Sequence, residues 1–530
     1  MDALAVPGPT WAQMFARHAH ADRPAVVSAD REWTFRELTR DAAGWAAWLD
    51  SGGLPAGRPV AVLLGSSPMA YALLLAGALT GRPLAPLGDR LTTSELTACL
   101  SPLGAGALVA DEEHAALGRE LAARAGLACH VLPDIPPAGA GDLDLAASGD
   151  AIALVLHTSG TTGLPKPVRF RMDRLGLRAR VYAGLLELRP DDVYSSSQQF
   201  HHLGGVGLLM VAMAVGAAVV PPVTRFSADS WAALGELGTT HATLAPAMIE
   251  RLLEAGTIRL PGLRTITYGS SPIRPATAAR LLAEHPSIGL LQGYSQTEGG
   301  PITALTPDDH RGAAAHRPEL LGSVGRAVRD TEVIIRRPDG DGIGEVWARG
   351  GHLAAPAPDG WLHTGDLGRL GTDGYLYLSG RKGDMIIRGG ENVYPEEVEN
   401  RIASHPGIRE AAVVGAPHEV LGEEVVAFIV PARSGKSPDA GELRRYVRQE
   451  LAGFKVPARW HVVEELPRGA LGKVLRRALR AEASSTPGGS GSLDSQIDVC
   501  EVPASGEERD VMARSVTFSA QPDAAALSDE

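Results

Sequence analysis

Short apolar runs alternate with longer amphipathic stretches through the first 300 residues of the chain. The runs at 58–64 and 151–157 are rich in Val, Leu and Ile and predict buried strands. The stretches at 68–81 and 228–238 predict helices that end at glycine. Strand–helix alternation of this kind predicts an α/β fold built on a doubly wound sheet.

Ligands in doubly wound sheets bind beyond the carboxyl ends of the strands. Distinctive loops follow three predicted strands, after residues 157, 268 and 292. We therefore expect these loops to form a binding site.

The pattern changes in the last third of the chain. Residues 330–379 hold short strands separated by PDGDG and TDG turns, which predicts antiparallel β-structure. A smaller α+β pattern follows. We predict a large N-terminal domain at 1–380, a smaller C-terminal domain at 381–483 and a disordered acidic tail at 484–530.

The uncharged segment 203–223 is long enough for a transmembrane helix. Its glycines and its Pro-Pro pair argue instead for a buried helix, a glycine turn and a short strand. We therefore expect no membrane insertion.

Charge and cysteine content narrow the choice of function. The net charge is −12, and residues 484–530 carry nine acidic residues against two arginines, so nucleic acid is not an expected partner. The three cysteines are widely spaced and no signal peptide is recognisable, so we predict a cytoplasmic protein. The oligomeric state is left open.

The segment HTSGTTGLPKPV (157–168) has the glycines, hydroxyls and lysine of a phosphate-binding loop. It does not match the G-x-x-x-x-G-K-[ST] signature. Taken alone, the segment is as typical of an ordinary flexible loop between two elements as it is of a phosphate-binding loop.

Four further segments carry polar chemistry in a fixed order. GYSQTEGG (293–300) offers an aromatic ring, a hydroxyl and a carboxylate that suits magnesium. HTGDLG (363–368) places Asp366 on what we predict to be a tight turn. GRKGDMIIRGGENVYPEEVE (380–399) and PRGALGKVLRR (467–477) follow.

These segments together closely resemble the adenylate-forming enzymes, a superfamily that includes acyl-CoA synthetases, adenylation domains and firefly-type luciferases. The resemblance covers about residues 10–480. It implies that residues 1–380 are an N-terminal AMP-binding and substrate domain of mixed sheets packed with helices, with a β-subdomain. It also implies that residues 381–483 are a small, mobile α+β lid domain that rotates between two half-reactions.

The resemblance also implies a role for each matching residue. The β- and γ-phosphates would be held by Thr158, Ser159, Gly160, Thr161, Thr162, Gly163 and Lys166. The remaining AMP-binding residues would be Gly269, Ser270, Tyr294 against adenine, Ser295, Asp366 on the ribose and Arg381. Thr297 would contact the α-phosphate, Glu298 would hold Mg²⁺, and Lys473 would bridge the substrate oxyanion and the α-phosphate.

The acyl site would be formed by the segment SSSQQFHHLGG (195–205) and by two of the loops. His201 aligns with the gate of the pocket and is grouped with the catalytic residues; the other pocket residues would be His202, Gly204, Ser271 and Gly293. For His202, a packed core histidine is an equal alternative.

Two positions depart from the family pattern. Pro167 stands where glycine is usual after the lysine, and it removes one backbone donor. Gly383 stands at the hinge, where Asp or Lys is usual, and its backbone freedom favours a less strictly two-state rotation.

The sequence thus predicts an ATP-dependent ligase that adenylates a small polar or aromatic carboxylic acid and transfers the acyl group to coenzyme A. A carrier-protein phosphopantetheine is the alternative thiol, so a carrier protein is the alternative partner. The sequence also leaves open an unusual oxyanion, an amine acceptor and a non-catalytic nucleotide-binding scaffold.

Overall fold

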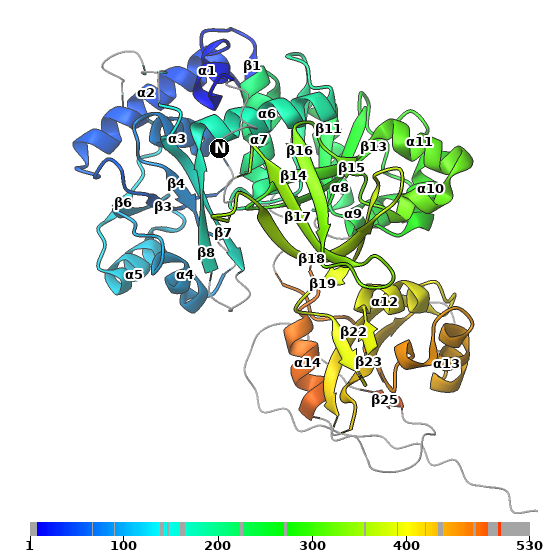
Figure 1. The fold of residues 1–530 in the computed structure, drawn as a ribbon. Coiled ribbons are helices and arrows are strands. Elements are labelled where there is room, and N and C mark those ends of the chain that lie inside the picture. Colours follow the sequence, from blue (N-terminus) through cyan, green and yellow to red (C-terminus); the bar gives the residue numbers. More distant parts are fainter. Residues whose placement is uncertain are drawn as a thin grey trace, which may run out of the picture. The chain divides into compact units, whose positions relative to one another are not determined.

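The computed structural model divides the chain into two units, Met1–Thr364 with Gly368–Leu378, and Gly365–Leu367 with Ser379–Glu530 (Figure 1). The structure describes residues 8–65, 67–88, 91–137, 143, 145, 148–159, 165–222, 226–269, 273–353, 357–389, 391–418, 420–432, 438–469, 473–485 and 497–499.

A nine-stranded sheet forms one half of the first unit. Its strands, in spatial order, are β15 (Arg326–Ala327), β14 (Gly300–Leu305), β13 (Gly289–Gln296), β12 (Thr265–Tyr268), β11 (His241–Leu244), β9 (Val193–Ser196), β10 (Ala218–Val220), β1 (Pro24–Val27) and β2 (Glu32–Thr34). The run from β13 to β1 is parallel throughout, as the alternating pattern predicts.

A six-stranded sheet forms the other half. Its order is β6 (Cys129–Val131), β5 (Ala107–Ala110), β3 (Val60–Leu63), β4 (Leu84–Pro86), β7 (Ile152–Ser159) and β8 (Pro165–Arg171). Only β8 runs antiparallel to its neighbour. All residues of β3 and β5 are buried, because helices cover both faces of a parallel sheet.

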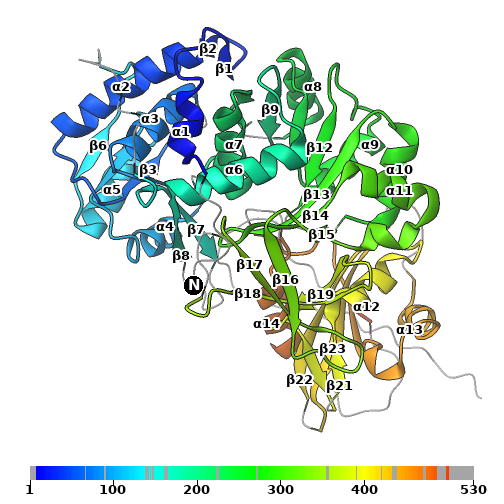
Figure 2. The same ribbon diagram turned by 45° about the horizontal axis from the view of Figure 1, so that its top comes forward.

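Eleven α-helices of the described part pack on these sheets: α1 (Trp11–Ala16), α2 (Phe35–Ser51), α3 (Pro68–Leu79), α4 (Thr93–Leu100), α5 (Ala115–Ala125), α6 (Met172–Leu186), α7 (Leu208–Val215), α8 (Ala228–Glu236), α9 (Pro246–Glu254), α10 (Pro275–Glu284) and α11 (Pro307–His316). Figure 2 shows α6 running between the two sheets, where it contacts β8 of one and β14 of the other. The loops of both sheets are thereby built on one shared core.

The uncharged segment 203–223 folds as the sequence predicts. A π-helical turn (Leu203–Gly207) leads into the buried helix α7, which ends at Gly216 with φ of +84°, and β10 follows. In the part of the chain that the structure describes, no helix is long and apolar enough to cross a membrane.

The antiparallel β-structure predicted after residue 330 is a four-stranded sheet of β16 (Thr331–Arg336), β17 (Gly344–Gly350), β18 (Leu362–Leu370) and β19 (Leu376–Arg381). The tight turn predicted around Asp366 is wrong. Asp366 lies in the middle of the nine-residue strand β18, because Gly365 takes a positive φ of +70° without interrupting the strand.

The second unit has helices on both faces of a sheet (Figure 1). Its elements are β20 (Ile386–Arg388), β21 (Glu391–Val393), α12 (Pro395–Ala403), β22 (Ile408–His418), β23 (Gly422–Pro431), α13 (Ala440–Arg448), β24 (Arg459–Val462), α14 (Arg476–Ser485) and β25 (Ile497–Val499). Alternate residues of β22 and β23 face α12 and α13 on one side and α14 on the other.

The predicted fold class is confirmed: a large unit of mixed sheets packed with helices accompanies a smaller α+β unit. From the tail, Ile497–Val499 pair with β24 as β25. The other tail residues from 486 onward lie outside the described residues, so the disordered tail stays a prediction, as do the predicted domain boundaries.

Candidate active site

The acyl-site segment follows β9, at the point where the connections of the nine-stranded sheet diverge. The chain leaves β9 for β10 on one side and later returns to β11 on the other side. In α/β sheets, ligands bind beyond the carboxyl ends of the strands at such a point of divergence. The Ser197 N–H donates to the Thr243 carbonyl (3.0 Å), and the Ser196 hydroxyl donates to the Gly204 carbonyl (2.7 Å). These bonds fix the segment at the end of β9.

His201 and His202 lie side by side in this segment, and His201 lines a cavity. Their ring centroids are 3.9 Å apart and their planes are inclined by 53°. Both side chains are partly exposed, so neither is a fully packed core histidine. Gly88 lies close to the His201 ring, because a Cβ built on Gly88 would stand 2.8 Å from Nε2. The loop after β4 therefore supports the predicted gate.

The carboxyl end of β12 meets the middle of β13 at two glycines. The expected loop after residue 292 is wrong, because β13 continues to Gln296. A Cβ built on Gly269 would lie 2.8 Å from the Gly293 carbonyl oxygen, closer than real side chains approach a backbone. Glycine at 269 thus lets the two predicted nucleotide loops come together. Ser270 and Ser271 lie outside the described residues.

A hydrogen-bond network lies behind these strand ends. Burial lowers the pKa of His310 to about 4, so the ring is neutral. Its Nδ1 donates to the Thr306 carbonyl (2.8 Å), and its Nε2 accepts from the Tyr268 hydroxyl (2.8 Å). The same hydroxyl lies 3.3 Å from the Gln292 side-chain oxygen. Tyr268 precedes Gly269 and Gln292 precedes Gly293, so the network ties both loops to α11.

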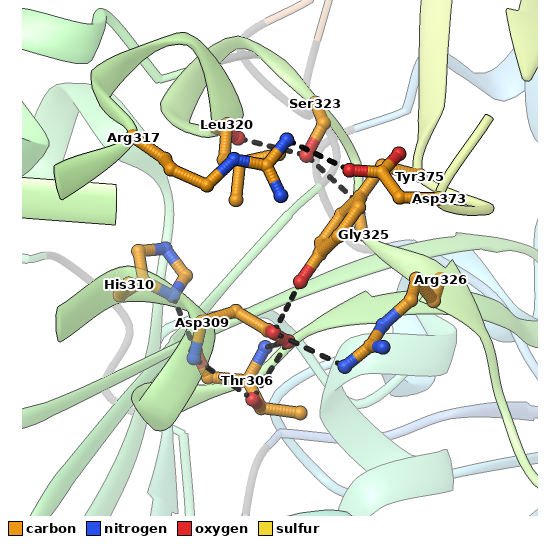
Figure 3. Close-up of polar contacts among 10 residues, drawn as sticks. All are labelled: Thr306, Asp309, His310, Arg317, Leu320, Ser323, Gly325, Arg326, Asp373 and Tyr375. Atoms are coloured by element: carbon orange, nitrogen blue, oxygen red, sulfur yellow. Dashed lines mark hydrogen bonds and ion pairs between the residues drawn. The ribbon is translucent and has the colours of Figure 1, made fainter. Parts of the chain in front are cut away.

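Figure 3 shows how this network continues through Asp309. The Asp309 carboxylate accepts from the Thr306 N–H (3.0 Å) and the Tyr375 hydroxyl (2.6 Å), and it pairs with Arg326 (3.3 Å). Burial opposes ionisation, but these bonds outweigh it and lower the pKa of Asp309. The contacts fasten α11 to the turn before β19.

Thr297 and Glu298 lie in the turn that joins β13 to β14. Both side chains are partly exposed, and Ser295 is exposed. Tyr294 is only 8% exposed and packs against Ile302 and Leu362, so its contact with adenine stays a prediction.

Glu298 suits a magnesium ion that is shared with phosphates. Among the described residues, no three His, Cys, Asp or Glu side chains gather in a way that could hold a metal. Mg²⁺ is usually held by one or two carboxylates together with substrate phosphates, and Glu298 offers one such carboxylate.

The phosphate loop leaves the carboxyl end of β7 and returns as β8. Thr158 pairs with Lys166 across this antiparallel pair, and Lys166 is exposed. Gly160, Thr161, Thr162 and Gly163 lie outside the described residues. Pro167 lies in β8, where it pairs with His157 of β7.

The second unit holds the predicted ribose-binding, hinge and lysine residues. Asp366 is 7% exposed and pairs with Arg381 (2.9 Å). The Gly383 carbonyl accepts from Arg480 of α14 (2.9 Å), so the predicted hinge is fastened to the last helix. Lys473 is exposed, and the Gly469 N–H donates to its carbonyl (2.9 Å).

One carboxyl group of this unit has an unusual proton affinity. Burial, followed by repulsion from Glu399, raises the pKa of Glu396 to about 7. Asp366 and Asp384 add to this repulsion, whereas Arg476 opposes it.

Sequence reasoning did not find Tyr268, Gln292 or His310. The first two are buried strand residues that immediately precede Gly269 and Gly293: Tyr268 ends β12, and Gln292 lies within β13. His310 belongs to the polar helix α11, where no motif marks it. Its signal was the capping sequence TPDD, which places His310 four residues after the cap Thr306.

The fold of each unit, taken with the motif-bearing segments that it positions, is that of an adenylate-forming ligase. The chain matches the AMP-binding enzyme family over residues 13–355 and the AMP-binding enzyme C-terminal domain over residues 397–473. It belongs to the AMP-binding enzymes, and it is an acid–thiol ligase of the AMP-forming type.

Curated relatives are similar over nearly their whole length. The fatty acid–[acyl-carrier-protein] ligase ScoC of Streptomyces coeruleorubidus is 33% identical, over 86% of this chain and 93% of the relative. The 2-succinylbenzoate–CoA ligase of Geobacillus kaustophilus is 33% identical, over 87% of this chain and 95% of the relative.

Solved structures share the fold. The o-succinylbenzoate CoA synthetase of Bacillus subtilis, in complex with its acyl-adenylate intermediate, has a TM-score of 0.79 at 29% identity, covering 89% of this chain and 98% of that chain. The amide bond synthetase McbA of Marinactinospora thermotolerans has a TM-score of 0.79 at 28% identity, and the match covers 89% of this chain and 99% of that chain.

Proposed function

We propose that the enzyme adenylates a small polar or aromatic carboxylic acid with ATP and Mg²⁺ and transfers the acyl group to coenzyme A. The observation that carries this proposal is the close approach of Gly269 to Gly293, together with the two adjacent histidines that follow β9 of the same sheet. Relatives named for 2-succinylbenzoate and ferulate support an acid of this size, and their names support coenzyme A.

The polarity of the segment after β9 supports the choice of substrate. His201 and His202 lie side by side and carry ring nitrogens, and the Gln198 N–H donates to the Ser196 hydroxyl (3.1 Å). Polar groups of this kind orient a ligand through hydrogen bonds, so they suit a small acid with polar groups or a ring better than a long alkyl chain.

In the first half-reaction, the carboxylate oxygen of the acid attacks the α-phosphorus of ATP, and pyrophosphate leaves. Thr297 would bind the α-phosphate and Lys166 the leaving phosphates. Lys473 would stabilise the charge that develops between the carboxylate and the α-phosphate. Glu298 would hold Mg²⁺, which neutralises phosphate charge when it is bound.

In the second half-reaction, a thiol attacks the acyl carbon and AMP leaves. The hinge at Gly383 would allow the lid to rotate between the two steps. Other residues of the lid would then replace Lys473 at the reacting groups. The contact of Arg480 with the Gly383 carbonyl supports this role, because it couples the hinge to α14, which begins three residues after Lys473.

A carrier-protein thiol is the second candidate acceptor, because ScoC is named as a ligase of the acyl-carrier protein. An amine is the third, because McbA is named as an amide bond synthetase. A cytoplasmic location is part of the proposal, and the three widely spaced cysteines support it.

The test is a panel of acids, each assayed for pyrophosphate release and then for acyl transfer to coenzyme A, a phosphopantetheinylated carrier protein and a simple amine. We expect pyrophosphate release with small aromatic or polar acids and thioester formation with coenzyme A. Transfer to the carrier protein or the amine alone would refute coenzyme A as acceptor.

A further inference from the structure

A cavity of about 70 Å³ lies at the carboxyl edge of the six-stranded sheet. The chain leaves β3 for β4 on one side and returns to β5 on the other, so the connections diverge between β3 and β5. In a parallel sheet this is where ligands bind. Leu64 and Gly65 after β3, and His114 after β5, line the cavity at this point.

Asp111 and His114 form a hydrogen-bonded pair beside the cavity. The His114 Nδ1 lies 2.6 Å from the Asp111 carboxylate, which also accepts the backbone N–H groups of Gly65 (2.7 Å) and His114 (3.0 Å). A carboxylate only accepts, so Nδ1 carries the proton. Nε2 makes no hydrogen bond to a described residue and is left as an acceptor. A carboxylate that orients an imidazole in this way prepares it to take a proton.

The cavity extends from this pair to the predicted acyl gate, because Phe200 and His201 also line it. His201 follows β9 of the nine-stranded sheet. The same cavity is therefore lined by residues that follow β3 and β5 of the six-stranded sheet and by residues that follow β9 of the nine-stranded sheet. Besides His114, its titratable lining groups among the described residues are Glu113 and His201, and no Lys or Arg is among them. This lining suits an uncharged or cationic nucleophile and disfavours a phosphate.

We propose that the cavity receives the nucleophilic end of the acyl acceptor and that His114, oriented by Asp111, accepts its proton. The sulfur of the thiol attacks the acyl carbon, the S–H proton passes to Nε2, and the bond between the acyl carbon and the phosphate oxygen breaks. AMP leaves with the electron pair, and the imidazolium then releases its proton to water. The inference rests on the proposed function, in which the acceptor is the thiol of coenzyme A.

The test is His114→Asn, in which the amide nitrogen replaces Nδ1 as the donor to Asp111 while the base is lost. Single-turnover transfer from the preformed adenylate to coenzyme A should be about 100-fold slower at pH 7, the lower range of general-base effects. ATP–pyrophosphate exchange should stay within about twofold of wild type, because the first half-reaction needs no such base. The exposed His20→Asn is the matched control and should leave both rates unchanged.

A pH series separates proton transfer from a structural effect. A thiol ionises unaided as the pH rises, so the gap between wild type and His114→Asn should narrow steadily from about pH 6.5 to about pH 9.5. Hydroxylamine is already uncharged at pH 7 and should intercept the adenylate equally fast in both proteins.

Equal transfer rates at pH 7, or a loss of the same size at every pH, would overturn the inference. Joint loss of pyrophosphate exchange would also contradict it; if His114→Asn is unfolded by circular dichroism, His114→Gln carries the same comparison. A wild-type enzyme that exchanges pyrophosphate but forms no thioester would refute coenzyme A and this inference together. Thioester formation at equal rates in wild type and variant would refute this inference alone.

Discussion

Replacing Gly269 with alanine tests whether the meeting of β12 and β13 builds the nucleotide site. The new Cβ would stand 2.8 Å from the Gly293 carbonyl oxygen, 0.6 Å short of the 3.4 Å at which ordinary contact begins. The obstacle is backbone, so the two loops must separate by about that distance. A displacement of 1 Å at a reacting centre costs about 100-fold in rate, so 0.6 Å corresponds to a loss of about tenfold.

The assay is ATP–pyrophosphate exchange under saturating acid, with thermal unfolding measured in parallel. We expect a tenfold or greater fall in kcat/KM for ATP while most of the protein stays folded at the assay temperature. Gly184→Ala is the matched control, because a Cβ added at Gly184 on α6 would meet no other element within 4 Å, and helix propensity favours alanine there. Wild-type exchange in Gly269→Ala would falsify the reasoning, because the loops would then not depend on their close approach.

Three further variants test the second unit. The pKa of Glu396 is raised from 4.5 to about 7, so the folded state loses stability as the pH rises through this range, and Glu396→Gln should be more stable than wild type at pH 8 by about 3 kcal/mol. Urea unfolding at pH 5 and pH 8 checks this, and a difference that is the same at both pH values would contradict it. Lys473→Ala should lower the rate of adenylate formation by about 10²–10³-fold, whereas acyl transfer from a supplied adenylate should survive. Single-turnover assays of both steps check this, and an equal loss of both rates would refute a role of Lys473 in the first half-reaction alone. Gly383→Pro should slow the alternation of the two half-reactions by restricting the hinge, and wild-type rates for both would remove Gly383 from that role.

The periodic parts of the fold were predictable because their physical signals are local. The uncharged segment 203–223 contains its own stop signal, Gly216, and the structure ends α7 there. Strand β18 was missed for the opposite reason. Gly365 and Gly368 interrupt its apolar alternation and resemble a turn, whereas its neighbours in the sheet keep the segment extended.

The site was predictable only where residues stand in contiguous motifs. The segments around Glu298, Asp366 and Lys473 were recognisable from their residue order alone. The structure adds the position of each segment among the strands, turns and helices. The pair of Asp111 and His114 could not be found in this way, because its meaning depends on where β3 and β5 lie in the sheet. The same holds for His310, whose partner Tyr268 is 42 residues away.

The measurement that tests the central claim most directly is pyrophosphate release with a panel of carboxylic acids, with and without coenzyme A. We expect release with at least one small aromatic or polar acid, and acyl thioester only when coenzyme A is added. Absence of pyrophosphate release with every acid, from a folded protein that binds ATP, would contradict the claim.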